Sequence, residues 1–261
     1  MRIDERLRES VARHGARAAV VGARGRHSFA ELDLKSERLA VALQGGGVAP
    51  GGCVAIFMDD GWEAVVSIFA VLKAGGVLVP VDAAATADVL SGTLNACQPV
   101  AVITQSRLAG TVAAAIAPLR SVKLVVLAGG DRARAGGTCI SFEEVVGRVG
   151  RMPPLMAATG DTDPAALFGG EVPLSHRQMA EEAAVIAVSD DGIVLPPLAE
   201  RPGLVWLVAA MAAGRTVVAR SRFPREEEAR RRLAESPRGE VDLDVSGLLG
   251  SMVGGAPAFQ R

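Results

Sequence analysis

Ser175 and His176 are the first residues that could do chemistry, because they are neighbours in the sequence. Many hydrolases activate a serine with a histidine, which requires a hydrogen bond from the hydroxyl to the imidazole. Adjacent residues of a helix point about 100° apart, so this pair is poorly placed for such a bond. Gln178 follows Ser175 at the spacing of a capping box. The sequence therefore favours helix capping as the role of the serine.

Two close pairs of carboxylates are a second candidate, because paired acids can serve as general acid and general base. They are Asp59 with Asp60 and Asp161 with Asp163. Both pairs lie in stretches that predict turns, where aspartate usually accepts hydrogen bonds from the local backbone. We therefore interpret them as turn residues.

The histidines and cysteines are too dispersed to predict a metal site. None of them forms a pair with ligand spacing; they are His14, His27, His176, Cys53, Cys97 and Cys139. The odd number of cysteines favours reduced thiols over a disulfide framework. The sequence thus predicts no catalytic, cofactor-binding or metal-binding residue, and no cofactor.

The bulk composition excludes several classes of partner. Lys and Arg number 28 against 29 Asp and Glu, a formal net charge of −1, so no overall field attracts nucleic acid or an anionic membrane. The N-terminal segment is charged, and no run reaches the ~20 apolar residues of a membrane span. We expect a globular protein of the cytoplasm that binds neither nucleic acid nor a membrane.

The stretch 63–82 organises the elements that must position these residues. Apolar side chains recur at helical spacing from Val65 to Leu72, which predicts a helix buried on most sides. Lys73 complements the dipole in its last turn, two glycines end the helix, and the apolar run 77–81 predicts a buried strand. With the apolar run 53–58 upstream, the unit is strand, helix, strand, and such units almost always close with right-handed parallel pairing.

The rest of the chain continues this alternation. A capping box at Ser28 and Glu31 opens a helix that ends at three glycines, 45–47. Because these glycines leave a helix rather than enter one, they do not predict a phosphate loop. Further helices are predicted at 86–97 and 107–119, with strands at 100–104 and 122–127. The alternation predicts an α/β protein built on a parallel sheet with helices on both faces.

A Pro-containing connector at 151–163 divides the chain. It predicts an α/β parallel-sheet subdomain at residues 1–160 and a second, smaller, incomplete α/β subdomain at 161–261. In the second part, two extended runs at 165–168 and 171–174 are joined by Gly169 and Gly170, which predicts a tight hairpin with a two-residue link.

Four blocks together resemble the N-terminal part of the adenylate-forming superfamily, which includes nonribosomal peptide synthetase adenylation domains and acyl-CoA ligases. The block at 71–82 is specific, and the others add weight by their order. The blocks are SFAEL at 28–32, GVAPG followed by a strand at 47–57, VLKAGGVLVPVD at 71–82, and DPA with VPLSHR at 163–165 and 172–177. The resemblance implies the fold of the first half of the family's large domain.

The departures from the family bear on activity. In the family, a Gly/Ser/Thr-rich loop ending in Pro-Lys-Gly lies between the last two flanks and wraps the ATP phosphates with backbone N–H groups and a lysine. Here the flanks meet across Gly169 and Gly170, and no lysine is nearby. The resemblance also puts Arg201 where amino-acid-activating members have an Asp for the substrate amine. The family's adenine and magnesium motif, ribose-binding Asp and catalytic Lys are expected beyond the 261 residues.

Three functions follow as hypotheses. The first is a catalytically inactive, truncated relative, a pseudoenzyme, that acts as a binding or complex-forming subunit in a natural-product or acyl-activation pathway. The second is the N-terminal piece of a split adenylation enzyme that a partner chain completes. The third is a stand-alone protein that binds a small acyl or carboxylate ligand.

The first two hypotheses imply a partner. Half of a large domain would expose helix faces and a sheet edge, and such surfaces usually meet another chain. We expect a homodimer or a hetero-complex with a biosynthetic enzyme. The predicted contacts are the helix at 203–213 and the stretch 241–253.

Overall fold

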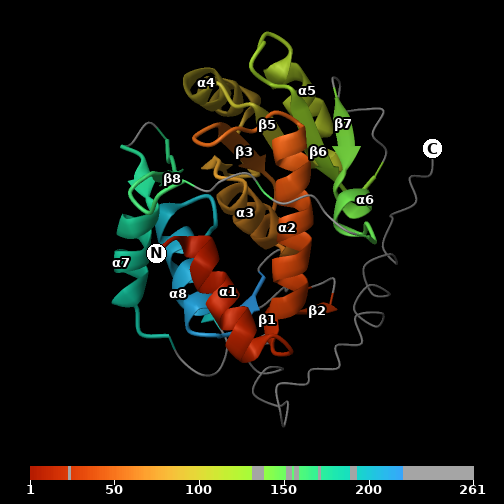
Figure 1. Cartoon of the computed structure of the whole chain (residues 1–261). Coiled ribbons are helices and arrows are strands. Elements are labelled where there is room, and N and C mark those ends of the chain that lie inside the picture. Colours follow the sequence, from red (N-terminus) through yellow and green to blue (C-terminus); the bar gives the residue numbers. More distant parts are fainter. Residues whose placement is uncertain are drawn as a thin grey trace, which may run out of the picture.

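A computed structural model describes residues 1–22, 25–130, 138–150, 155, 159–169, 172–188 and 193–219. These residues form two β-sheets with helices around them (Figure 1). The larger sheet has seven strands, in the order β7 (Cys139–Ser141), β6 (Leu124–Ala128), β5 (Ala101–Gln105), β3 (Cys53–Phe57), β4 (Val77–Val81), β8 (Pro164–Ala166) and β9 (Leu174–Ser175).

Strand pairing in the larger sheet is parallel from β7 to β8. The central strand β3 lies between β4 and β5, with Val54 opposite Leu78 on one side and Ala101 on the other. Among the described strands of this sheet, only the last pair, β8 with β9, is antiparallel. The predicted parallel closure of the strand, helix, strand unit is therefore confirmed. β7 had no counterpart in the sequence prediction.

Helices cover both faces of this sheet, which confirms the predicted fold class. On β3, Val54 and Ile56 join one apolar cluster, whereas Ala55 and Phe57 join another, because successive side chains of a strand point to opposite faces. The first cluster includes residues of α2 (Phe29–Gly45), α3 (Trp62–Lys73) and α6 (Phe142–Val146). The second includes residues of α4 (Ala87–Cys97), the 3₁₀ turn Ser106–Leu108 and α5 (Ala109–Ile116).

Helix α3 is the centre of the molecule. All of its residues are buried, and it contacts α2, β3 and β4 as well as β1 (Ala18–Gly22) of the smaller sheet. The predicted burial on most sides is confirmed. Gly75, which follows the helix, has a φ of 78°, a conformation that glycine adopts without steric cost. The chain then enters β4 directly.

Lys73 does more than complement the helix dipole. Its Nζ donates to the Asp33 carboxylate at 2.5 Å and to the Asp33 carbonyl at 2.7 Å. The lysine side chain is fully buried beneath α2. Burial lowers the pKa of the Lys73 amine, and the charge of Asp33 opposes this effect. The lysine of the most specific sequence block therefore ties α3 to α2.

The smaller sheet joins residues from both ends of the described chain. Its order is β10 (Ile193–Val194), β11 (Val217–Val218), β1 and β2 (Gly25–Ser28). β11 pairs with β1 in parallel, with Val217 opposite Val20. Residues after 160 also supply β8 and β9 to the larger sheet. Both ranges of the predicted division thus contribute strands to both sheets, and the boundary near residue 160 stays a prediction.

Three helices, α1 (Ile3–His14), α7 (His176–Ala184) and α8 (Arg201–Ala212), pack together beside the two sheets (Figure 1). Arg2 connects this group to the core. Its guanidinium donates to Asp4, to Thr159 and, at 2.6 Å, to the carbonyl of Leu72 at the end of α3. Arg2 and Asp4 are both buried, so they form an ion pair inside the protein.

The predicted role of the helix at 203–213 as a partner contact stays a prediction, although most of its apolar side chains pack inside this chain. Gly203, Leu204 and Leu207 are buried within this chain, because α8 packs on α1 and α7. The other predicted contact, 241–253, lies outside the described residues. No described helix has the length and apolar character needed to cross a membrane.

Candidate functional site

The connection between β8 and β9 is the candidate site, because the resemblance points to phosphate binding between its flanks. β8 extends the larger sheet beside β4, and the Leu167 N–H donates to the Leu78 carbonyl at 2.8 Å. β9 returns antiparallel, with Ala166 opposite Leu174. The predicted two-residue hairpin is wrong, because both strands are shorter than expected. Seven residues, 167–173, connect them.

The seven residues of this connection have the sequence LFGGEVP. They include no lysine, arginine, serine or threonine, and their one charged side chain is the carboxylate of Glu171. No lysine follows Lys123 anywhere in the sequence. A phosphate cradle needs backbone N–H groups together with a positive field. The connection is long enough to supply some N–H groups, but its own side chains supply only negative charge.

The residues that enter the connection are also acidic. The Asp163 carboxylate accepts a hydrogen bond from the Gly160 N–H at 2.7 Å, as expected of a turn residue. Asp161 accepts hydrogen bonds from the Arg177 side chain at 3.0 Å and from the N-terminal amine at 2.9 Å. Those two hydrogen bonds lower the pKa of Asp161 to about 2. Arg177, the cation nearest to the connection in the sequence, is thus already paired.

Ser175 and His176 lie where β9 enters α7. Ser175 Oγ accepts from the Gln178 N–H at 3.2 Å, and the predicted capping box is confirmed. His176 is fully buried, and neither ring nitrogen has a hydrogen-bond partner among the described residues. Burial, followed by the charge of Arg2, lowers the pKa of His176 to about 4. The imidazole is therefore neutral at neutral pH.

The other two histidines lie elsewhere in the structure. The His27 ring stacks on Trp62, with 3.9 Å between the ring centroids and 12° between the planes. His14 packs against Gly214. Within the described ranges, no three His, Cys, Asp or Glu side chains gather as a metal site would require.

Arg201, which the resemblance aligns with the substrate-binding Asp of some family members, begins α8. Its guanidinium forms an ion pair with Glu182 on α7. The pair is partly exposed, so it links two neighbouring helices at the surface. Asp59, one of the other candidates, pairs with Arg107, and its N–H donates to the Gln105 side chain at 3.3 Å.

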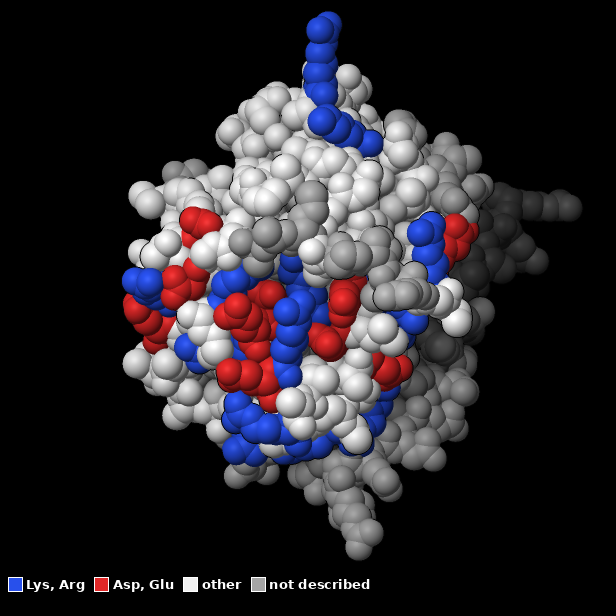
Figure 2. All heavy atoms as spheres, in the orientation of Figure 1, with Lys and Arg blue, Asp and Glu red and all other residues white. Residues whose placement is uncertain are grey.

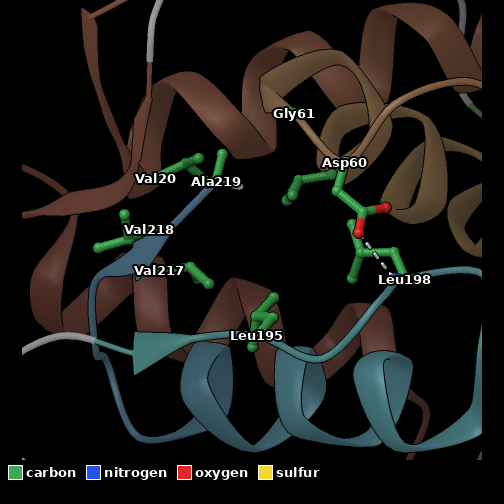
Figure 3. A pocket seen from close by; sticks show the side chains of 9 residues that line it. Val20, Asp60, Gly61, Leu195, Leu198, Val217, Val218 and Ala219 are labelled. Carbon is green, nitrogen blue, oxygen red and sulfur yellow. Dashed lines mark hydrogen bonds between the residues drawn. The ribbon is translucent and has the colours of Figure 1, made fainter. Parts of the chain in front are cut away.

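A small hollow lies between the smaller sheet and the start of α3 (Figure 3). Its walls are almost entirely apolar, and Asp60 is the exception. The Asp60 carboxylate accepts from the Leu198 N–H at 3.1 Å, so it already fixes the segment that leads into α8. The hollow is lined by Val20, Asp60, Gly61, Val65, Leu195, Leu198, Val217, Val218 and Ala219.

Two buried polar contacts could not be anticipated from the sequence. The ion pair of Lys73 with Asp33 joins residues 40 positions apart, and the hydrogen bond of Arg2 to Leu72 spans 70. No local pattern marks either partner.

The family model and the curated relatives each match part of the chain. The family model described as "AMP-binding enzyme" matches residues 7–167, so the match ends at the start of the connection between β8 and β9. A linear gramicidin synthase of Brevibacillus parabrevis is 40% identical over 93 residues, which are 36% of this chain and 2% of that protein. An isonitrile lipopeptide synthase of Mycobacterium tuberculosis is 38% identical over 112 residues, 41% of this chain and 4% of that protein.

Solved structures show the same fold. MbtA of Mycobacterium smegmatis superposes with a TM-score of 0.74 at 26% identity, over 88% of this chain and 45% of that one. A benzoate CoA ligase from Burkholderia xenovorans gives 0.75 at 20% identity, over 90% and 48%. The chain therefore spans less than half of these structures and a few per cent of the synthases. Because the family model covers more than half of its residues, the chain belongs to the family of AMP-binding enzymes.

Proposed function

We propose that this chain keeps the framework of an adenylate-forming ligase, does not hold ATP, and acts as a binding or complex-forming subunit beside a biosynthetic enzyme. The composition of residues 167–173 carries the proposal. They lack lysine, serine and threonine and include a glutamate. A triphosphate there would meet the carboxylate of Glu171 and no lysine, serine or threonine side chain of the connection, whereas anions need a positive field.

The pathway part of the proposal rests on the printed names of the relatives, which are synthases of gramicidin and of an isonitrile lipopeptide. We assign the chain to a comparable natural-product or acyl-activating pathway in the cytoplasm. This chain has a surface suited to contact a partner, either a second copy of itself or a biosynthetic enzyme. The surface over α4 and α5 is mostly uncharged, whereas charges of both signs gather over α1 (Figure 2). Between residues 87 and 116 the only charged residues are Asp88 and Arg107.

The hollow of Figure 3 makes a stand-alone carboxylate-binding protein less favourable. Its polar side chain is the carboxylate of Asp60. A carboxylate ligand would bring like charge next to it, which disfavours binding. A complex-forming role does not require this hollow to accept a ligand.

The direct test is ATP–pyrophosphate exchange by the isolated chain with amino acids, fatty acids and aryl acids, with an intact enzyme of the family as positive control. We expect no exchange, and no heat of ATP·Mg²⁺ binding in calorimetry. Exchange by this chain alone with any of these acids would refute the proposal.

A second measurement separates an inactive subunit from a piece of a split enzyme. Proteins that co-purify from the native host are identified, expressed and mixed with this chain before the exchange assay. A stable complex without exchange supports the inactive subunit, and exchange only in the mixture supports the split enzyme. Light scattering at micromolar concentration that shows a monomer, together with no recovered partner, would contradict both.

A further inference from the structure

Two of the three cysteines lie at the same end and on the same face of the larger sheet. Cys53 is the first residue of β3. Because strand side chains alternate, it projects to the same face as Ala55 and Phe57, the face that α4 and α5 cover. Cys97 is the last residue of α4. Both cysteines are partly buried and pack against the same apolar cluster.

The backbone brings these two positions together. The Val100 N–H donates to the Cys53 carbonyl at 2.9 Å, so the start of β5 lies directly beside Cys53. Only two residues separate Cys97 from Val100. One of them, Gln98, has a φ of 45° and ends α4 in a left-handed turn that sends the chain back to the sheet. Cys97 therefore precedes by three residues the backbone contact that Val100 makes with the first residue of β3.

The thiols also interact electrostatically. Burial is the main reason that the pKa of Cys97 is raised to about 11, and the charge of Cys53 raises it further. Burial raises the pKa of Cys53 as well. The third cysteine, Cys139, lies on the edge strand β7 and packs against a different apolar cluster. Cys139 therefore serves as an internal control.

We propose that Cys53 and Cys97 form an oxidisable dithiol, which a small-molecule disulfide such as glutathione disulfide converts into an intramolecular disulfide bond. One thiol loses its proton and attacks the glutathione disulfide, which gives a mixed disulfide and one glutathione thiolate. The second thiol loses its proton and attacks the protein sulfur of that mixed disulfide, which releases the second glutathione thiolate. Two protein thiols are oxidised, and one glutathione disulfide is reduced to two glutathiones.

The bond would clamp the end of α4 to the start of β3. It would close a loop that includes α3 and β4, and a loop of that length restricts the unfolded chain strongly. The clamp lies at the amino ends of the parallel strands, whereas the connection after β8 leaves a carboxyl end. Its formation is therefore independent of whether this chain binds a nucleotide.

Trypsin allows a clean test, because Arg38, Lys73 and Arg107 are successive cleavage sites. Cys53 then falls in peptide 39–73, Cys97 in 74–107 and Cys139 in 135–148. The full chain is equilibrated in glutathione buffers of increasing oxidation at pH 8, alkylated, digested and analysed by mass spectrometry. The variants are Cys53→Ser, Cys97→Ser and, as the matched control, Cys139→Ser.

We expect one species whose mass is that of 39–73 plus 74–107 minus two hydrogen atoms, in the wild type and in C139S but in neither C53S nor C97S. The melting temperature of oxidised wild type should rise by roughly 5–10 °C over the reduced form. Because both thiols titrate above pH 8, the rate should increase about tenfold per pH unit from 7. Mixed glutathione adducts without the linked peptide, or a linked peptide that includes 135–148, would overturn the proposal.

Discussion

The unit β3–α3–β4 and the connection between β8 and β9 preserve different parts of the family pattern. In the first, the motif residues remain, and the structure shows their structural roles. The buried Lys73 forms an ion pair with Asp33, and Gly75 turns the chain into β4. In the second, the flanking strands remain, while residues 167–173 lack the side chains that a phosphate requires. The chain has therefore retained the motif residues that stabilise the fold and lacks those that bind phosphate.

This difference teaches that the most specific sequence block is a marker of fold rather than of activity. Its lysine is inaccessible and already paired, so it takes no part in binding a nucleotide. A family match that ends at residue 167 rests on such framework residues. Inference of activity has to start from the connection that follows.

The largest expected effect tests the central unit. Asp33→Ala leaves the Lys73 ammonium buried without its carboxylate, and removing one partner of a buried pair costs about 3–5 kcal/mol. The free energy of unfolding in urea measures this loss. The matched control is Asp88→Ala on the exposed first turn of α4, where we expect a loss below about 1 kcal/mol. In D33A/K73M, where an apolar side chain replaces the unpaired amine, at least half of the loss should be recovered. If D33A is as stable as D88A, the lysine does not hold the unit together.

The next largest effect is the pH dependence of stability that arises from His176, which follows β9. The folded state holds His176 neutral with a pKa of about 4, whereas the unfolded chain has an ordinary value near 6.5. The unfolded state therefore binds more protons between these values. The contribution to stability is complete above pH 6.5 and is lost as the pH falls towards 4, by about 2–3 kcal/mol.

Urea unfolding at pH 7, 5.5 and 4.5 checks this prediction. The variants His176→Phe and His176→Gln cannot titrate, so their stability should change less over the same range. Equal pH slopes for the wild type and both variants would show that His176 does not titrate as its burial requires.

A smaller effect compares glycines of the two regions. A Cβ at Gly76 would lie 3.1 Å from the Gly52 carbonyl oxygen, which cannot move easily because it accepts from Val77. Gly76→Ala should cost about 1–3 kcal/mol. A Cβ at Gly169 would meet nothing within 4 Å, and only its φ of 38° opposes a side chain, so Gly169→Ala should cost about 1 kcal/mol. Thermal unfolding ranks the two, and the reverse order would contradict the packing of the central unit.

The smallest effect separates capping from catalysis. Ser175→Ala removes the acceptor for the Gln178 N–H and should cost about 1 kcal/mol, the usual value for an N-cap. Ser28→Ala is the matched control, because Ser28 caps α2 in the same way. Esterase activity towards small activated esters that disappears in S175A but not in S28A would point to a nucleophile instead.

The sequence predicted the elements better than their partners. Alternation and capping predicted the bounds of α2, α3, β3 and β4 to within a few residues, because periodicity and local hydrogen bonds depend on residues that are close in the sequence. Pairing across the chain has no such local mark. The sequence therefore did not predict the insertion of β8 beside β4 or the burial of most of α8. It wrongly predicted a two-residue link in place of the seven-residue connection. The absence of phosphate-binding side chains was visible, because it depends on composition alone.

The pairing of β1 with β11 constrains the order in which the parts of this protein can fold during synthesis on the ribosome. Val20 pairs with Val217, which is synthesised about 200 residues later. At ordinary translation speeds, synthesis of these intervening residues takes roughly 10–40 s. Until then the first hairpin has an unpaired edge, and α1 lacks the helices that cover it. The seven-stranded sheet is emerging meanwhile, so the N-terminal segment must stay open while the core closes beside it. A chaperone that shields short apolar strands would have its natural substrate in that interval.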